Sequence, residues 1–133
     1  MNDRQRQLSL ATEIANRHDD LHPWEVAVLA CNRDRKADFY AFLTGLLHDA
    51  MEDGYCSEEE LAQFPQEVQD AVRDLTREEG ESYPSYLKRV RGASSLARKV
   101  KLSDAEVNLT RCQRSFGYES LEKRYRHVIE VLS

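Results

Sequence analysis

The sequence predicts an all-α fold, a compact single domain of about seven or eight helices. Apolar residues recur at spacings of three and four along most of the chain, which is typical of amphipathic helices. Strand patterns are weak, and only 5 glycines and 3 prolines interrupt the 133 residues. A chain of this length suits one hydrophobic core, so we expect a single domain over residues 1–133.

Three helices are expected in the first half of the chain. Residues 5–17 carry apolar side chains at positions 8, 10, 11, 14 and 15, a stripe along one helix face. His22 begins a second helix, because Pro23 suits a first helical turn. The third is expected over residues 36–53, with Asp34 as its N-cap and Gly54 as its end.

The second half is expected to hold the remaining helices. Ser57 and Glu60 have the spacing of a capping box and open a short helix over 58–64. Pro65 opens the next helix, which Gly80 breaks. Further helices are expected over three ranges that follow, the last of them after Gly117: 83–92, 94–112 and 118–133.

Composition excludes several classes of protein. The formal net charge of -5, with both signs well mixed, provides no electrostatic footprint for nucleic acid. No apolar run approaches the roughly 20 residues that cross a bilayer, and the first residues lack the apolar core of a signal peptide. Cys31, Cys56 and Cys112 are scattered, without a CxxC pair, which argues against a thiolate zinc site. We expect a soluble cytoplasmic protein.

The stretch "LLHDAMEDG", residues 46–54, places one histidine and three carboxylates beside a run of core-type residues. On a helical wheel His48, Asp49, Glu52 and Asp53 share one arc of roughly 140°. Carboxylates this close repel one another, and they are unfavourable in the last turn of a helix. A metal ion, a basic side chain or exposure to water would relieve this repulsion. The pattern favours a cation, and the alternative is a solvated acidic helix end.

A second polar cluster lies in "KVKLSDAEVNL", residues 99–109. Lys101, Asp104, Asn108 and Arg111 follow one another at spacings of three, four and three, on one helix face. A carboxylate followed one turn later by an amide suits a metal ligand beside a substrate contact. Taken alone, the cluster favours a surface stripe that contains a Lys101–Asp104 contact. His22 by itself is compatible with a helix cap or a surface residue.

Together the motifs "HP" at 22–23, "LLHDAMED" at 46–53 and "KLSDAEVN" at 101–108 resemble the HD superfamily of metal-dependent phosphohydrolases. The likeness is closer to its RelA/SpoT branch, the (p)ppGpp hydrolase domain and its small stand-alone relatives. It extends from about residue 8 to the end of the chain. An HD dipeptide alone is nonspecific, whereas the whole set of motifs in this order is specific. The resemblance implies an HD-type helical bundle.

The resemblance also implies roles for individual residues. The implied metal ligands are His22, His48, Asp49 and Asp104. Glu52 and Asp53 would be the catalytic carboxylates that handle the water, and Asn108 and Tyr125 would contact the substrate. Two imidazoles and two carboxylates suit Mn²⁺, Fe²⁺ or Zn²⁺ rather than calcium, and the family likeness favours Mn²⁺. Lys101 and Arg111 are not given by the motif, but either is a candidate to offset charge on the leaving pyrophosphate, with a surface position as the alternative for Lys101.

The segment before His22 departs from the family pattern. It is only "ANRHDDLHP", without the expected glycine, proline and tyrosine. Arg17 and His18 lie near the positions of the expected basic residues, so Arg17 is a candidate substrate contact, with a surface position as the alternative. His18 is the alternative first metal ligand, and the proline after His22 favours His22. His127 is expected to have no role.

The expected function is hydrolysis of a nucleotide phosphate or pyrophosphate ester, (p)ppGpp-like, with one divalent metal ion as cofactor. The partner is therefore a small-molecule nucleotide. Two alternatives stay open: a phosphatase for another nucleotide or a dinucleotide cofactor, and a metal-holding nucleotide-binding module without turnover. No synthetase-like segment follows the hydrolase-like one, and no glycine-rich phosphate loop is present. The native metal and the oligomeric state do not follow from the sequence.

Overall fold

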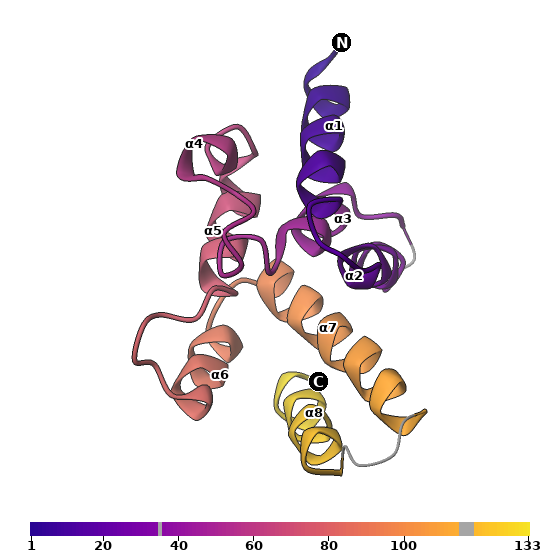
Figure 1. The fold of residues 1–133 in the computed structure, drawn as a ribbon, viewed down its shortest axis with the longest axis vertical. Helices are drawn as coiled ribbons and strands as arrows, with labels where there is room; N and C mark the ends of the chain where they lie inside the picture. Colours follow the sequence, from indigo (N-terminus) through magenta and orange to yellow (C-terminus); the bar gives the residue numbers. More distant parts are fainter. Residues whose placement is uncertain (35, 115–118) are drawn as a thin grey trace.

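Helices form every regular element in the part of the chain that the structure describes. The computed structural model describes residues 1–34, 36–114 and 119–133, and these ranges contain eight helices (Figure 1). This confirms the predicted all-α class and the number of helices. The helices are α1 (Asp3–Ala15), α2 (His22–Cys31), α3 (Phe39–Leu47), α4 (Glu58–Leu61), α5 (Gln66–Asp74), α6 (Tyr83–Arg91), α7 (Ser95–Gln113) and α8 (Glu119–Leu132). Gly117 and Tyr118, where the last helix was expected to begin, lie outside the described residues.

The third helix is shorter than predicted at both ends. Asp38 rather than Asp34 caps α3, because its side chain accepts a hydrogen bond from the amide of Ala41, whereas Asp34 binds Lys99. The helix ends at Leu47, and residues 48–54 form a series of turns. The ring of His48 contacts the Gly45 carbonyl. If the helix continued, this carbonyl would accept a hydrogen bond from the backbone amide four residues later. The helix predicted over residues 36–53 is therefore wrong beyond Leu47, and His48, Asp49, Glu52 and Asp53 lie on turns rather than on one helix face.

Two other boundaries also differ. The helix that begins after Pro65 ends at Asp74, well before Gly80. Arg89 donates hydrogen bonds to the carbonyls of Asp74 and Thr76, which an extended helix would have paired internally. The capping box of Ser57 and Glu60 is present as predicted, although α4 is a single turn.

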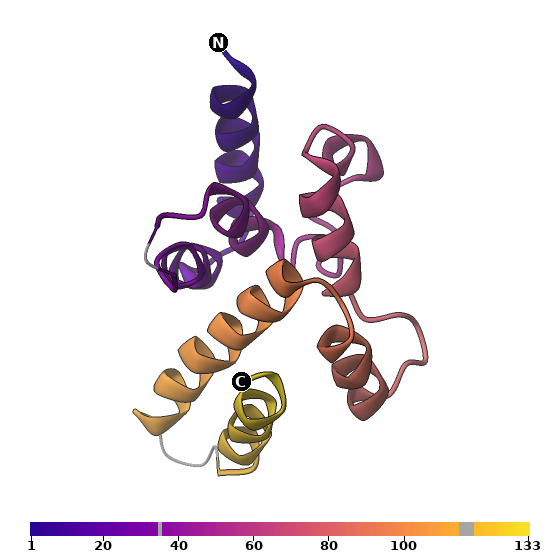
Figure 2. The same ribbon diagram turned by 180° about the vertical axis from the view of Figure 1, so that it is seen from behind.

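The central helix of the fold is α7, which packs against α2, α3, α5, α6 and α8 (Figures 1 and 2). One core cluster joins α1 and α3 to α5 through side chains such as Ile14, Leu43 and Val68. A second joins α2 to α7 through Val26 and Val100. Burial of these apolar side chains is the main stabilising contribution to the bundle.

Helices α2 and α3 approach each other closely at Gly45. A Cβ atom at this position would lie 2.5 Å from the Cα atom of Ala27, so a side chain does not fit there. This close approach positions the start of α2 and the end of α3 on the same side of α7. No helix in the described ranges is long and apolar enough to span a bilayer.

Candidate functional site

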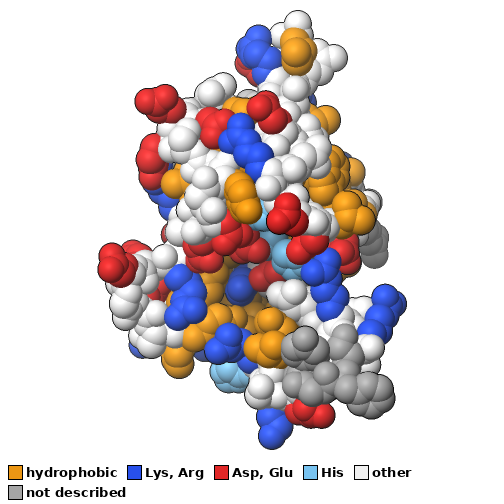
Figure 3. Space-filling view, viewed as in Figure 1, with side chains coloured by type: hydrophobic (Ala, Val, Ile, Leu, Met, Phe, Trp, Pro, Cys, Tyr) orange, Lys and Arg blue, Asp and Glu red, His pale blue; other side chains and the backbone are white. Residues whose placement is uncertain are grey.

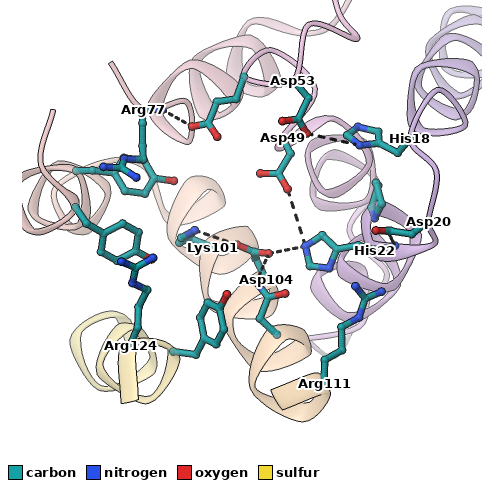
Figure 4. Close-up of a pocket in the computed structure, with 16 residues that line it drawn as sticks. His18, Asp20, His22, Asp49, Asp53, Arg77, Lys101, Asp104, Arg111 and Arg124 are labelled. Atoms are coloured by element: carbon teal, nitrogen blue, oxygen red, sulfur yellow. Dashed lines mark hydrogen bonds and ion pairs between the residues drawn. The ribbon is translucent and has the colours of Figure 1, made fainter. Parts of the chain in front are cut away.

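Four side chains from three separate parts of the chain converge on one point. Each of His22, His48, Asp49 and Asp104 offers a ligand atom, and these atoms all lie within 4.8 Å of one another. His22 Nε2 lies 2.7 Å from Asp104 Oδ1, and His48 Nε2 lies 3.1 Å from Asp49 Oδ2. Both histidine rings therefore direct Nε2 toward Asp49 and Asp104. Figure 4 shows His22 between these two carboxylates.

Local structure places each of these side chains. Asp20 accepts a hydrogen bond from the amide of His22 at 2.6 Å, so the loop before α2 fixes the first turn of that helix. His48 and Asp49 follow the last residue of α3. Asp104 lies in the middle of α7, where it is 4% exposed and Ser103 and Ala105 beside it are buried.

The orientation of His48 is set by the backbone. Its Nδ1 lies 2.6 Å from the Gly45 carbonyl and donates to it, so Nε2 carries the lone pair in the neutral ring. Burial lowers the pKa of His48, but the charges of Asp49 and Asp104 outweigh this and raise the pKa well above its usual value. His48 Nε2 is buried and makes no well-formed hydrogen bond with the described residues. The raised pKa favours a protonated ring in the metal-free protein, so a metal ion bound at Nε2 would take the place of that proton.

Asp104 is the most heavily contacted acid of the cluster. It accepts from Lys101 Nζ at 2.9 Å and from Asn108 Nδ2 at 3.2 Å, in addition to its contact with His22. Burial raises the pKa of Asp104, but the charge of Lys101 and the contacts with His22 and His48 lower it well below its usual range. The carboxylate is therefore held ionised inside the protein.

The four side chains fit a single divalent ion. Nitrogen and oxygen ligands at about 2.1 Å from one ion lie roughly 3–3.5 Å from each other. The separations between the Nε2 atoms and the carboxylate oxygens, 2.7 to 4.0 Å, bracket that range. The donor set combines two imidazoles with two carboxylates, which suits first-row transition ions rather than calcium.

The cluster lies on one side of a cavity of about 390 Å³. Carboxylates and a histidine border one side of the hollow, and Lys and Arg side chains border the other (Figure 3). Three of these cations surround one ring: Arg124 lies 4.5 Å, Arg77 5.4 Å and Lys101 5.9 Å from the centre of Tyr83. The cavity therefore pairs a negatively charged metal-ligand cluster with a positively charged wall.

Most of the residues expected at the site do line this cavity. Besides His22, Asp49 and Asp104 of the cluster, the lining includes Glu52, Asp53, Lys101, Asn108, Arg111 and Tyr125. Arg111 also pairs with Glu25 of α2 at 2.5 Å. His18 lines the cavity next to Asp53 but does not belong to the four-residue cluster. Of the two histidines weighed for the first ligand position, His22 is the one that the structure brings to the cluster.

Arg17 is not brought to the cavity. Both Nη atoms of its guanidinium lie 2.9 Å from the carboxylate of Glu60, and Nη1 also donates to the Tyr55 carbonyl. These bonds hold Arg17 against the loop before α4 and outside the cavity lining, so the structure offers no support for the expected substrate contact by Arg17. His127 is exposed on α8 and does not belong to the cavity lining.

Part of the positive wall of the cavity was not predicted from the sequence. Arg77, Tyr83, Tyr86 and Arg124 line the cavity, although none belongs to a motif that was singled out. Arg77, Tyr83 and Tyr86 lie within residues 75–90, between the motifs at 46–53 and 101–108. Their proximity to α7 depends on tertiary packing, which sequence spacing does not reveal. No family model and no curated protein matches this chain.

Proposed function

We propose that the protein is a metal-dependent phosphohydrolase that acts on a nucleotide phosphate or pyrophosphate ester, of the kind found in the RelA/SpoT branch of the HD superfamily. The observation that supports the proposal most strongly is the convergence of two imidazoles and two carboxylates beside a cationic wall in one cavity. A phosphate ester needs both features, because its negative charge must be neutralised on both sides of the bond that breaks.

His22, His48, Asp49 and Asp104 would hold the ion, for which Mn²⁺ is the proposed identity and Fe²⁺ or Zn²⁺ the alternatives. When bound, such an ion lowers the pKa of water and neutralises phosphate oxygens. The Gly45 carbonyl keeps the His48 ring in the orientation that presents Nε2. Lys101 and Asn108 keep the Asp104 carboxylate ionised and fixed in position.

The remaining residues of the cavity would bind and orient the substrate. Asp53 and Glu52 line the cavity on the turn that follows the ligands His48 and Asp49, where acidic groups can accept a proton or orient a water molecule. Arg77, Lys101 and Arg124 carry the charge that would oppose phosphate oxygens. Tyr125 adds a ring and a hydroxyl group on the side of α8.

A nucleotide other than (p)ppGpp is the alternative substrate. Arg17 is bound to Glu60 and does not reach the cavity, so the short segment before His22 supplies no arginine to a base there. This observation weakens the assignment of a guanine nucleotide more than it weakens the assignment of the reaction. The non-catalytic alternative, a metal-holding nucleotide-binding module, would use the same cluster and cavity.

The experiment is a screen of nucleotides with the purified protein loaded with Mn²⁺, with separate assays for phosphate and pyrophosphate. Release of pyrophosphate from (p)ppGpp supports the first substrate, and release of phosphate from other nucleotides supports the alternative. Loss of the activity in Asp49→Asn would assign it to this centre. A protein that binds the metal and the nucleotides but releases neither product would contradict the proposed hydrolysis.

A further inference from the structure

The segment that joins α5 to α6 is tied down at several points. Arg89 on α6 donates to the carbonyls of Asp74 and Thr76, at 2.8 and 2.9 Å, and pairs with the carboxylate of Glu81 at 2.9 Å. That carboxylate also accepts from the amide of Glu78 at 3.1 Å. These bonds fix both ends of the segment, and its middle faces the cavity.

Glu52 makes the bond that ties this segment to the metal-ligand side of the cavity. Its Oε1 accepts a hydrogen bond from the backbone N–H of Arg77 at 2.5 Å, although 25 residues separate the two in sequence. Glu52 belongs to the turns over residues 48–54 that also carry His48 and Asp49. The carboxylate thus holds the Arg77 backbone, and no ion pair with the Arg77 guanidinium is present among the described residues.

The Arg77 guanidinium is consequently left for another partner. Its Nη2 donates to the Glu81 carbonyl at 3.0 Å, and the group lies over the rings of Tyr83 and Tyr86, at 5.4 and 6.0 Å. The guanidinium of Arg124 also lies over the Tyr83 ring, 4.5 Å from its centre. Within the described ranges no carboxylate pairs with either arginine. Two cations beside the same ring repel each other, and an anion bound in the cavity would relieve the repulsion.

We propose that Glu52 is a positioning residue, whose carboxylate fixes the Arg77 backbone and so holds the Arg77 guanidinium in the cavity to bind a phosphoryl group of the ligand. This proposal rests on the proposed function for the nature of the ligand. It departs from the role implied by the family resemblance, in which Glu52 handles the water, and it leaves Asp53 as the carboxylate for that task. Glu52 acts on the ligand through Arg77.

Two substitutions of Glu52 separate the hydrogen bond from the charge. Glu52→Gln and Glu52→Ala remove the same negative charge, but the glutamine keeps an oxygen acceptor for the Arg77 amide. If Glu52 acted on an anion only through its charge, both substitutions would strengthen anion binding equally. If it acts through Arg77, the alanine variant binds an anion more weakly than the glutamine variant does. The comparison needs no turnover, so a failure of the proposed hydrolysis would not be mistaken for a failure of this inference.

The experiment is an NMR titration of the ¹⁵N-labelled, metal-free protein with inorganic phosphate, combined with hydrogen exchange at the Arg77 amide. Arg77→Ala is expected to weaken phosphate binding about tenfold, the typical value of a charge-assisted contact. Glu52→Ala is expected to weaken it several-fold and to accelerate exchange at Arg77, and Glu52→Gln is expected to do neither. Arg91→Ala, which removes an exposed arginine on α6 outside the cavity lining, is the charge-matched control.

The double variant Glu52→Ala/Arg77→Ala provides the decisive comparison. Because Glu52 acts through Arg77, the double variant is expected to bind phosphate no more weakly than Arg77→Ala alone. Additive losses, or tighter phosphate binding by Glu52→Ala than by Glu52→Gln, would overturn the proposal. Unchanged exchange at the Arg77 amide in Glu52→Ala would overturn it as well, since the hydrogen bond would then not hold the segment.

Discussion

His22 Nε2 lies 2.7 Å from Asp104 Oδ1, although 82 residues separate the two in sequence. The contact joins the first turn of α2 to the middle of α7 and closes the cluster that His48 and Asp49 complete. Because each of the three segments is fixed by its own packing, the four ligand atoms are held together before any ion binds. A prearranged site of this kind binds a metal without first ordering its ligands.

Removal of Asp104 is expected to abolish stoichiometric metal binding. Asp104 Oδ1 lies 2.7 Å from His22 Nε2 and 3.4 Å from His48 Nε2, so Asp104→Ala removes the carboxylate that both histidines contact. The measurement is the metal content of protein dialysed against Mn²⁺, by mass spectrometry. Asp70→Ala, at an exposed acid on α5, is the control and should keep its metal. One ion per chain retained in Asp104→Ala would remove Asp104 from the ligand set.

Gly45→Ala is expected to destabilise the fold. The added Cβ atom would lie 2.5 Å from the Ala27 Cα atom, so α2 and α3 must move apart, at a cost of about 1–3 kcal/mol. Denaturant unfolding measures the change in the free energy of unfolding. Gly92→Ala is the control, because a Cβ atom there meets its nearest neighbours at 3.8 Å. Equal stability of the two variants would show that the helices tolerate the extra atom.

Lys101→Met is expected to destabilise the metal-free protein more than the metal-loaded protein. Lys101 is the cation that neutralises the buried Asp104 carboxylate, and loss of one partner of a buried pair costs of the order of 3 kcal/mol. A bound divalent ion would supply the missing positive charge. Thermal unfolding with Mn²⁺ and with EDTA tests this, with the exposed Lys88→Met as control. A loss of stability that is the same in both conditions would contradict the expected compensation.

Glu81→Gln is expected to flatten the acid unfolding profile. Its hydrogen bonds with Arg89 lower the pKa of Glu81 to about 2, against roughly 4.3 in an unfolded chain. A carboxylate with a lowered folded-state pKa stabilises the fold above pH about 4.3, and that contribution is lost as the pH falls toward 2. The free energy of unfolding, measured from pH 6 to 2, should therefore fall less steeply in Glu81→Gln than in the exposed control Glu59→Gln. Parallel profiles for the two variants would contradict this assignment.

Local patterns in the sequence were sufficient for the helical class, whereas the four-residue cluster was expected from the family resemblance. The capping box at Ser57 and the proline after His22 mark helix starts that the structure confirms. The end of α3 was not predictable from spacing, because it depends on how the His48 ring meets the Gly45 carbonyl. Apolar and charged residues keep a helical spacing beyond Leu47, so the sequence pattern does not mark the end of the helix.

The cationic wall was the part of the site that sequence reasoning could not supply. Arg77 lies between α5 and α6 and Arg124 lies on α8, and both reach the Tyr83 ring because α6 and α8 pack on α7. Arg17, by contrast, was placed near the substrate by its position in the chain, and the structure pairs it with Glu60, 43 residues away. Long-range packing determines which carboxylate a surface arginine contacts. A single sequence carries little information about that packing.

The most direct test of the central claim is a crystal structure of the Zn²⁺-loaded protein with anomalous diffraction at the zinc edge. The expected result is one strong peak at about 2.0–2.2 Å from ligand atoms of His22, His48, Asp49 and Asp104. An anomalous map without a peak among these four side chains, or with the ion bound by other residues, would contradict the metal centre and the hydrolase proposed from it.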